Sequence, residues 1–182
     1  MRDKDIDYYE QVLIKGNYFP YYEKKFQEWL DSEGDYFKLK TYVHISVDES
    51  ERGVAIDVGA NVGLITRILS EFYDYVIAIE PSSQNRACLY RNMKAAANNI
   101  IVLPFAAGKS NAMSHLRINT INCGGTAIDF KYCESNVIEP IEIRTIDEIA
   151  LVAPKPDAIS LIKIDIQGGE YDALQGASRT IM

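Results

Sequence analysis

The sequence predicts an α/β fold in which helices flank a parallel β-sheet. From Val54 onward, short apolar runs alternate with segments whose apolar residues recur every three to four positions. The run Tyr75–Ile79 is almost continuously apolar, which is typical of a parallel strand covered on both faces. Strands that alternate with helices form right-handed βαβ units, and such units build a parallel sheet.

Four parallel strands are expected, each followed by a loop or helix. The expected strands are residues 54–56, 75–79, 100–103 and 159–166. A helix from Leu64 to Phe72 should follow the first strand, a second helix should follow Pro81, and a third should follow Gly169.

The alternation of strand and helix is interrupted after Lys109. Residues 116–118 and 141–143 alternate apolar and polar side chains, which predicts two exposed strands in an antiparallel excursion. Thr145 and Glu148 have capping-box spacing, so a short helix should begin after Thr145.

The first 50 residues differ from the rest in being rich in tyrosine and charge. Apolar residues spaced for one helical face follow Pro20, namely Tyr22, Phe26, Trp29 and Leu30. We therefore expect residues 1–50 to form a helical cap or extension, and residues 51–182 to form the α/β domain. The apolar face would pack on that domain, cover a binding site or form a dimer contact.

Composition and charge exclude several classes of partner for this protein. The 182 residues suffice for one domain with a sizeable core, and the 26 acidic against 19 basic residues give a net charge of −7. An acidic surface repels phosphate backbones, so no nucleic-acid partner is expected. No apolar run approaches the ~20 residues of a membrane span, and the charged N-terminus does not resemble a signal peptide. The three cysteines and two histidines suggest no metal site, so we expect a cytoplasmic protein with reduced thiols.

Two common phosphate-binding loops do not fit. Gly108–Ser110 matches the end of a P-loop, but Leu103 occupies the position of its first glycine. A dinucleotide fingerprint that began at Gly59 would need glycines where the chain has Asn61 and Leu64.

A third kind of loop fits better. Asp57 ends the first strand, and Gly59 and Gly63 frame the turn into the helix. This arrangement suits S-adenosylmethionine: Asp57 would orient its amino end, and the free N–H groups of residues 62–64 would face its carboxylate. Glu80, at the end of the second strand, would accept hydrogen bonds from the ribose hydroxyls.

Several motifs in this order resemble the FkbM-type S-adenosylmethionine-dependent methyltransferases, over residues 52–179. They are Ile56–Gly63, Glu80–Pro81 with Asn85, Ala106–Gly108, Thr145–Glu148, and Lys163–Gly168 with Glu170 and Gly176–Ala177. The resemblance implies a class I, Rossmann-like methyltransferase sheet. It also implies S-adenosyl-L-methionine as cofactor and, most often, O-methylation of a hydroxyl of a sugar, glycan or other small molecule.

The resemblance also assigns cofactor-binding residues. These are Asp57, Gly59, Ala60, Asn61, Gly63, Glu80, Pro81, Ser82, Asn85, Ala106, Ala107 and Asp165. The glycine loop with Asn61 would line the methionine part, Ala106 and Ala107 the adenine, and Asp165 the methyl group and the acceptor.

Three residues are candidates for catalysis. Asp165 would act as base or orienter, Glu170 is a further candidate, and Lys163 would bind the acceptor or form an ion pair with Asp165. The family usually has glutamate where this chain has Gln167. If that carboxylate takes part in the chemistry, the chain is catalytically impaired; if it braces the loop, little changes.

The chain ends soon after Gly176–Ala177, where family members continue with further strands. We therefore expect a sheet truncated after its fourth parallel strand and the following helix. That strand would be an open edge, and the edge or the N-terminal helix could form a homodimer. The competing hypothesis is an impaired cofactor-binding module or a fragment that needs a partner chain. Methylation of protein or nucleic acid is a third option, and the acidic charge disfavours the latter.

Overall fold

The computed structural model describes residues 52–93, 98–119, 126–128 and 137–181. The helix predicted within residues 1–50 lies outside these ranges, and so does most of the loop that joins the two exposed strands. The helical cap and the domain boundary at residue 51 therefore stay predictions.

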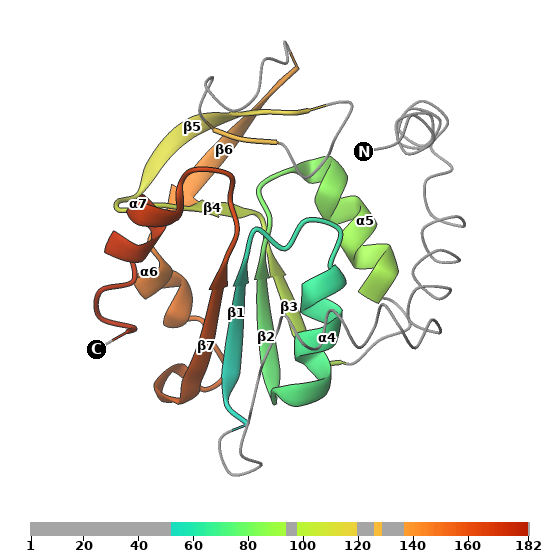
Figure 1. Cartoon of the computed structure of the whole chain (residues 1–182), viewed down its shortest axis with the longest axis vertical. Helices are drawn as coiled ribbons and strands as arrows, with labels where there is room; N and C mark the ends of the chain where they lie inside the picture. The colour runs from blue at the N-terminus through green and yellow to red at the C-terminus, as the bar shows by residue number, and fades with distance from the viewer. Residues whose placement is uncertain (1–51, 94–97, 120–125, 129–136, 182) are drawn as a thin grey trace. The chain divides into compact units, whose positions relative to one another are not determined.

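The larger sheet is parallel throughout, as predicted (Figure 1). Its strands run in the order β3-β2-β1-β7. They are β1 (Val54–Val58), β2 (Tyr75–Ile79), β3 (Ile100–Leu103) and β7 (Ile159–Ile164). β1 is buried along its whole length because β2 and β7 flank it and helices cover the sheet. β7 ends at Ile164, two residues before the predicted end of the fourth strand.

Helices cover both faces of this sheet. They are α4 (Leu64–Phe72), α5 (Ser83–Met93), α6 (Ile146–Ala150) and α7 (Glu170–Gln175), with a short 3₁₀ helix at Pro156–Ala158. On one face, Ile56 and Ile77 pack in a core with Ile146 of α6 and Ala173 of α7. On the other face, α5 contributes Leu89 to a smaller core, and α4 lies on the same side (Figure 1). Burial on both faces accounts for the apolar character of β2.

A second sheet follows β3 and lies beyond the carboxyl ends of the first sheet's strands (Figure 1). It consists of β4 (Phe105–Ala107), β5 (Ala112–Arg117) and β6 (Ile138–Arg144), in the order β4-β6-β5. The antiparallel pairing of β5 with β6 confirms the predicted excursion. β4, which pairs in parallel with β6, was not predicted.

Local signals define how α6 begins and how it joins α7. The Thr145 hydroxyl accepts a hydrogen bond from the backbone N–H of Glu148 at 3.2 Å, which confirms the predicted N-cap. The N–H of Asp147 donates to the Gly176 carbonyl at 2.9 Å. The end of α7 is thereby tied to the start of α6.

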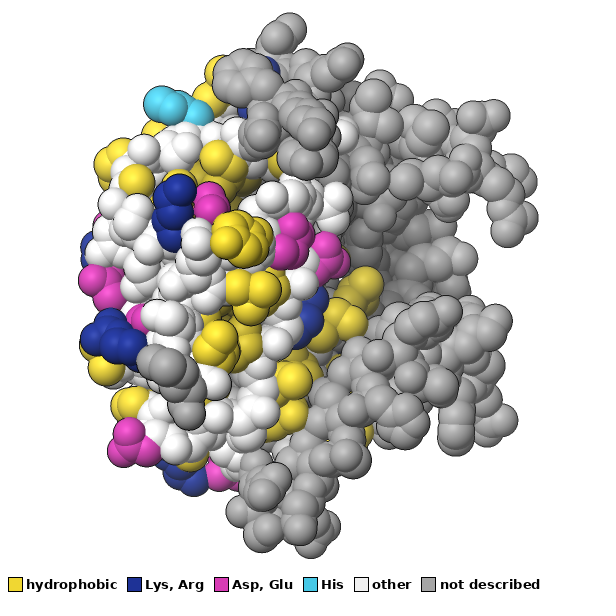
Figure 2. All heavy atoms as spheres, turned by 60° about the vertical axis from the view of Figure 1, so that its left-hand side comes forward, with side chains coloured by type: hydrophobic (Ala, Val, Ile, Leu, Met, Phe, Trp, Pro, Cys, Tyr) yellow, Lys and Arg dark blue, Asp and Glu magenta, His cyan; other side chains and the backbone are white. Residues whose placement is uncertain are grey.

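The described surface carries mixed charge. On the face turned forward in Figure 2, lysine and arginine side chains are scattered among acidic and apolar ones. No helix among the described residues has the length and apolar character needed to span a membrane.

Candidate functional site

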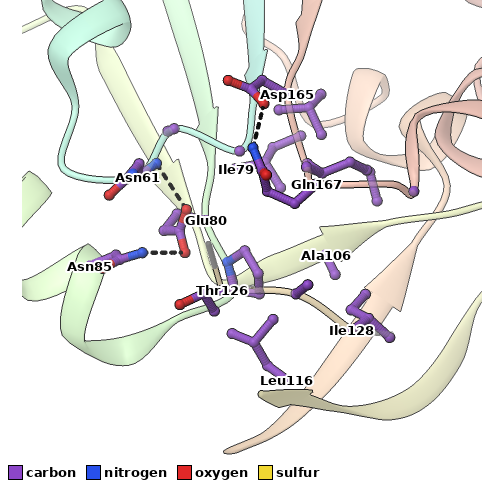
Figure 3. A pocket seen from close by; sticks show the side chains of 18 of the residues that line it. Asn61, Ile79, Glu80, Asn85, Ala106, Leu116, Thr126, Ile128, Asp165 and Gln167 are labelled. Carbon is purple, nitrogen blue, oxygen red and sulfur yellow. Dashed lines mark hydrogen bonds between the residues drawn. The ribbon is translucent and has the colours of Figure 1, made fainter. Parts of the chain in front are cut away.

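A cavity of about 470 Å³ opens at the carboxyl ends of β1, β2 and β7 (Figure 3). Small-molecule sites usually measure ~300–1,000 Å³, and open parallel sheets bind ligands at this end of their strands. Many residues predicted from the sequence lie in its wall. They are Gly59, Ala60, Asn61, Glu80, Pro81, Asn85, Ala106, Ala107, Lys163 and Asp165.

The loop after β1 is held against the neighbouring strands. The N–H groups of Gly59 and Ala60 both donate to the carbonyl of Ile79, at 2.9 and 3.0 Å. Gly59 has φ +79°, and a Cβ on it would lie 2.0 Å from the backbone oxygen of Asp165. Glycine is therefore required here by the close approach of two backbones.

Gly63 has a structural role that differs from the predicted one. It precedes α4 with φ +92°, and a Cβ would lie 3.0 Å from the Met93 side chain and 3.2 Å from Leu89. Gly63 does not line the cavity, whereas its neighbours Val62 and Leu64 do. Its small size lets α4 pack near α5 and so places the start of the helix at the cavity.

Glu80 is a buried carboxylate in the cavity wall, only 5% exposed. Its oxygens accept hydrogen bonds from the N–H of Asn61 at 2.8 Å, the N–H of Ser82 at 2.9 Å and the Asn85 amide at 3.3 Å. Figure 3 shows Asn61 above Glu80 and Asn85 to its left, each joined to it by a dashed line. Burial raises the pKa of Glu80, although these donors and the nearby Arg86 act in the opposite direction.

Ser82 supports Glu80 from outside the cavity. It is 1% exposed and does not lie in the wall. Besides the bond from its N–H to Glu80, its hydroxyl accepts from the N–H of Asn85 at 3.3 Å. Ser82 thus fixes the turn into α5 that carries Glu80 and Asn85.

Asp57 is fully buried and does not line the cavity, so the structure does not support its predicted contact with the ligand. Its carboxylate pairs with the Lys163 ammonium at 2.9 Å and accepts from the Thr66 hydroxyl at 2.6 Å. Lys163 also donates to the carbonyl of Gly59 at 3.0 Å. The three groups link β1, β7 and α4 and hold the glycine loop from behind.

The pairing of Lys163 with Asp57 corrects the expectation that Lys163 would act on Asp165. The prediction assumed that both residues belong to one strand and share a face. β7 ends at Ile164, however, and Lys163 lies opposite Asp57 in the β1–β7 register. The Lys163 ammonium therefore binds Asp57 and the Gly59 carbonyl, and Asp165 accepts a side-chain hydrogen bond from Gln167.

Asp165 lies in the cavity wall and is contacted by Gln167. The Gln167 amide donates to Oδ1 of Asp165 at 3.1 Å (Figure 3). Glu170, the third predicted catalytic residue, is outside the wall. Its carboxylate accepts from the N–H of Ile166 at 3.0 Å and of Gly168 at 2.9 Å, so it braces the loop. Burial pushes the pKa of Glu170 upward, but the backbone donors outweigh it and lower that pKa.

Part of the wall was not predicted from the sequence. It comes from the second sheet and the segment beside it: Phe105, Leu116, Thr126, Ala127, Ile128 and Ile143. The alternating pattern predicted strands here, but it did not show which side faces the cavity. No spacing signal in the sequence links these residues to the glycine loop.

Fold and site together define an α/β domain with a cavity of small-molecule size at the carboxyl end of a parallel sheet. The sequence model of the Methyltransferase FkbM domain matches residues 57–182. The chain belongs to this FkbM methyltransferase family. None of the curated proteins matches the chain.

Several solved structures are similar to the chain over part of its length. Methyltransferase FkbM from Methylobacillus flagellatus KT is 24% identical with a TM-score of 0.48, covering 72% of this chain and 30% of its own. M. jannaschii TYW2 in complex with AdoMet is 29% identical with a TM-score of 0.32, covering 40% of this chain and 33% of its own. The N-terminal domain of human METTL16 in complex with SAH is 20% identical with a TM-score of 0.28, covering 38% and 29%. The chain thus spans less than half the length of each of these proteins.

Proposed function

We propose that the cavity binds S-adenosylmethionine and that the protein transfers its methyl group to a hydroxyl of a sugar, glycan or other small molecule. Membership of the FkbM family supports methyl transfer. The observation that carries the cofactor assignment is Glu80, a buried carboxylate beside the glycine loop and in the cavity wall. A buried charge is costly unless it has partners, and a ligand with hydroxyl donors would add to them.

The residues present fit this cofactor. An ionised carboxylate has about four acceptor positions, and Glu80 uses three for Asn61, Ser82 and Asn85, which leaves capacity for a ribose hydroxyl. Oδ1 of Asn61 is buried and has no hydrogen-bond partner among the described residues, so it can accept from the amino group of the ligand. Ala106 and Leu116 offer apolar surface for the adenine.

The charge of the wall also suits a cationic ligand. Glu80, Asp165 and Asp172 all line the cavity. Lys163, the basic residue of the wall, is already paired with buried Asp57. The surplus of negative charge favours a ligand that carries a sulfonium and an ammonium group.

Asp165 is the residue that we assign to the acceptor. When bound, S-adenosylmethionine supplies a methyl group on a positively charged sulfur, which an acceptor oxygen takes up as the carbon–sulfur bond breaks. Asp165 would orient the acceptor hydroxyl and accept the proton that it loses. Lys163 and Glu170 would act indirectly, because each is bound to the backbone of a loop in the wall.

Calorimetry with S-adenosylmethionine tests the cofactor assignment. Glu80→Ala should weaken binding by about 10- to 100-fold, since a hydrogen bond to a charged group contributes ~1.5–3 kcal/mol. Glu71→Gln, at an exposed site of α4 outside the wall, is the matched control and should bind like the wild type. Equal affinities in all three proteins would refute the role of Glu80.

Transfer of a labelled methyl group to a panel of glycans and hydroxylated small molecules tests the reaction. Incorporation into a hydroxyl would support the proposal. Binding of the cofactor without transfer to any acceptor would favour a binding module. Absence of cofactor binding would refute both functions.

A further inference from the structure

Asp165 has an unusual neighbour for a residue assigned to proton transfer. Within the described part of the chain, its carboxylate accepts one side-chain hydrogen bond, from the neutral amide of Gln167 at 3.1 Å. The basic residue two positions earlier, Lys163, donates instead to Asp57 and Gly59. Both Asp165 and Gln167 lie in the cavity wall, and Figure 3 shows the bond between them at its edge.

The backbone holds Gln167 in a conformation that few side-chain-bearing residues adopt. Gln167 has φ +58°, and Gly168 follows with φ +107°. Such a conformation costs free energy and persists only where the surroundings impose it. Here Glu170 binds the N–H groups of Ile166 and Gly168, on either side of Gln167. The N–H of Asp165 is itself bound to the Val58 carbonyl at 3.0 Å, so both ends of the contact are anchored.

The charged groups around Asp165 are already bound to other partners. They are Lys163 with Asp57, Glu170 with the loop backbone, Asp172 with Lys109 at 4.0 Å, and Glu80 with its three donors. An amide donor stabilises a carboxylate without adding a charge and does not titrate. Gln167 therefore orients the Asp165 carboxylate without adding a charge to the cavity wall.

We propose that Gln167 is a positioning residue for Asp165. It binds Oδ1 and leaves the other oxygen of the carboxylate to the acceptor; this role rests on the proposed methyl transfer. Gln167 then acts on the acceptor side of the cavity and not on cofactor binding. The amide can donate to Asp165 at any pH, whereas a carboxylate in its place could donate only when protonated.

The contact itself is tested by NMR of the Gln167 side-chain amide in the full chain. Its signal should move when acid protonates Asp165, and the movement should disappear in Asp165→Asn. A signal that does not respond to acid in the wild type would overturn the pairing, whether or not any acceptor is methylated.

The side of the cavity on which Gln167 acts is tested by calorimetry with S-adenosylhomocysteine. Gln167→Ala should bind it within about twofold of the wild type, because the contact serves the acceptor. A loss of tenfold or more would make Gln167 a cofactor contact and would overturn the proposal. Failure of the wild type to bind would instead refute the proposed function, while the NMR result would still decide the pairing.

The steady-state kinetics of methyl transfer separate positioning from a merely structural role. Gln167→Ala should lower kcat by about tenfold or more with the KM for S-adenosylmethionine unchanged. An unchanged kcat in Gln167→Ala, or a loss that appears in the KM for S-adenosylmethionine instead, would overturn the proposal.

Discussion

Replacing Lys163 by methionine leaves a buried carboxylate behind the glycine loop without its counter-charge. Asp57 is 0% exposed and would keep only the Thr66 hydroxyl of its two side-chain partners. Removing one member of a buried ion pair costs ~3–5 kcal/mol. The Lys163 side chain is 24% exposed, so water can reach the space it leaves, and we expect a loss of about 2–3 kcal/mol.

The reverse replacement should cost less. Asp57→Asn keeps an oxygen that can accept a hydrogen bond from the Thr66 hydroxyl. The Lys163 ammonium is partly exposed, so it stays hydrated and keeps its hydrogen bond to the Gly59 carbonyl. We expect about 1 kcal/mol, typical of one altered hydrogen bond. The exposed pair of Lys155 with Asp74, at 2.6 Å, is the matched control: Lys155→Met should leave the free energy of unfolding almost unchanged, because water screens an exposed pair.

Urea unfolding of the full chain at pH 7 measures these differences in the free energy of unfolding. Each kcal/mol corresponds to a shift in Tm of about 2–4 °C for a chain of this size. Lys163→Met should also bind S-adenosylmethionine about tenfold more weakly, because the Gly59 carbonyl loses a charged donor. The reasoning is refuted if Lys163→Met costs less than the Lys155→Met control, or if Asp57→Asn costs more than Lys163→Met.

Three further predictions concern the loops of the cavity. Gly59→Ala should destabilise the fold by about 2 kcal/mol or more in urea unfolding and abolish cofactor binding, because φ is +79° and the new Cβ would lie 2.0 Å from the Asp165 oxygen. The pKa of Glu80 is raised, and its ionised form is the one that accepts hydrogen bonds from the cofactor. Cofactor affinity measured by calorimetry should therefore begin to fall, on acidification, at a pH above the ordinary pKa of glutamate. An affinity that stays constant down to that ordinary pKa would contradict this prediction. Glu170→Ala should cost about 1–2 kcal/mol near neutral pH, because two backbone donors lose their acceptor. The folded-state pKa of Glu170 is lowered, so its contribution is present above the ordinary glutamate pKa and is lost as the pH falls through the lowered value; wild type and variant should converge in acid.

The sequence predicted well those elements that depend on neighbouring residues. The run from Tyr75 to Ile79 forms β2 over its predicted bounds, and Thr145 caps α6 as its spacing with Glu148 indicated. Glu80 was expected beside the glycine loop, and its carboxylate binds the N–H of Asn61 in that loop. These signals are local, or follow from the rule that parallel strands end at one edge.

Contacts across strands were harder to predict. Lys163 was expected to act on Asp165, yet it pairs with Asp57, more than 100 positions earlier in the chain. The wall formed by the second sheet was missed for the same reason. Which strands are neighbours, and in which register, is decided by how the whole sheet packs, and a single sequence carries no direct signal for it.

The sequence alone determined the four parallel strands and the helices that follow them, the glycine loop and the acid after the second strand, because each of these depends on residues close together along the chain. The tertiary structure decided how the acidic groups are used. Asp57 is enclosed with Lys163 behind the loop, Glu80 and Asp165 line the cavity, and Glu170 binds the loop backbone. The physical reason is burial: the same carboxylate is a structural anchor where the fold encloses it with a cation, and a ligand-binding group where the fold leaves one side open.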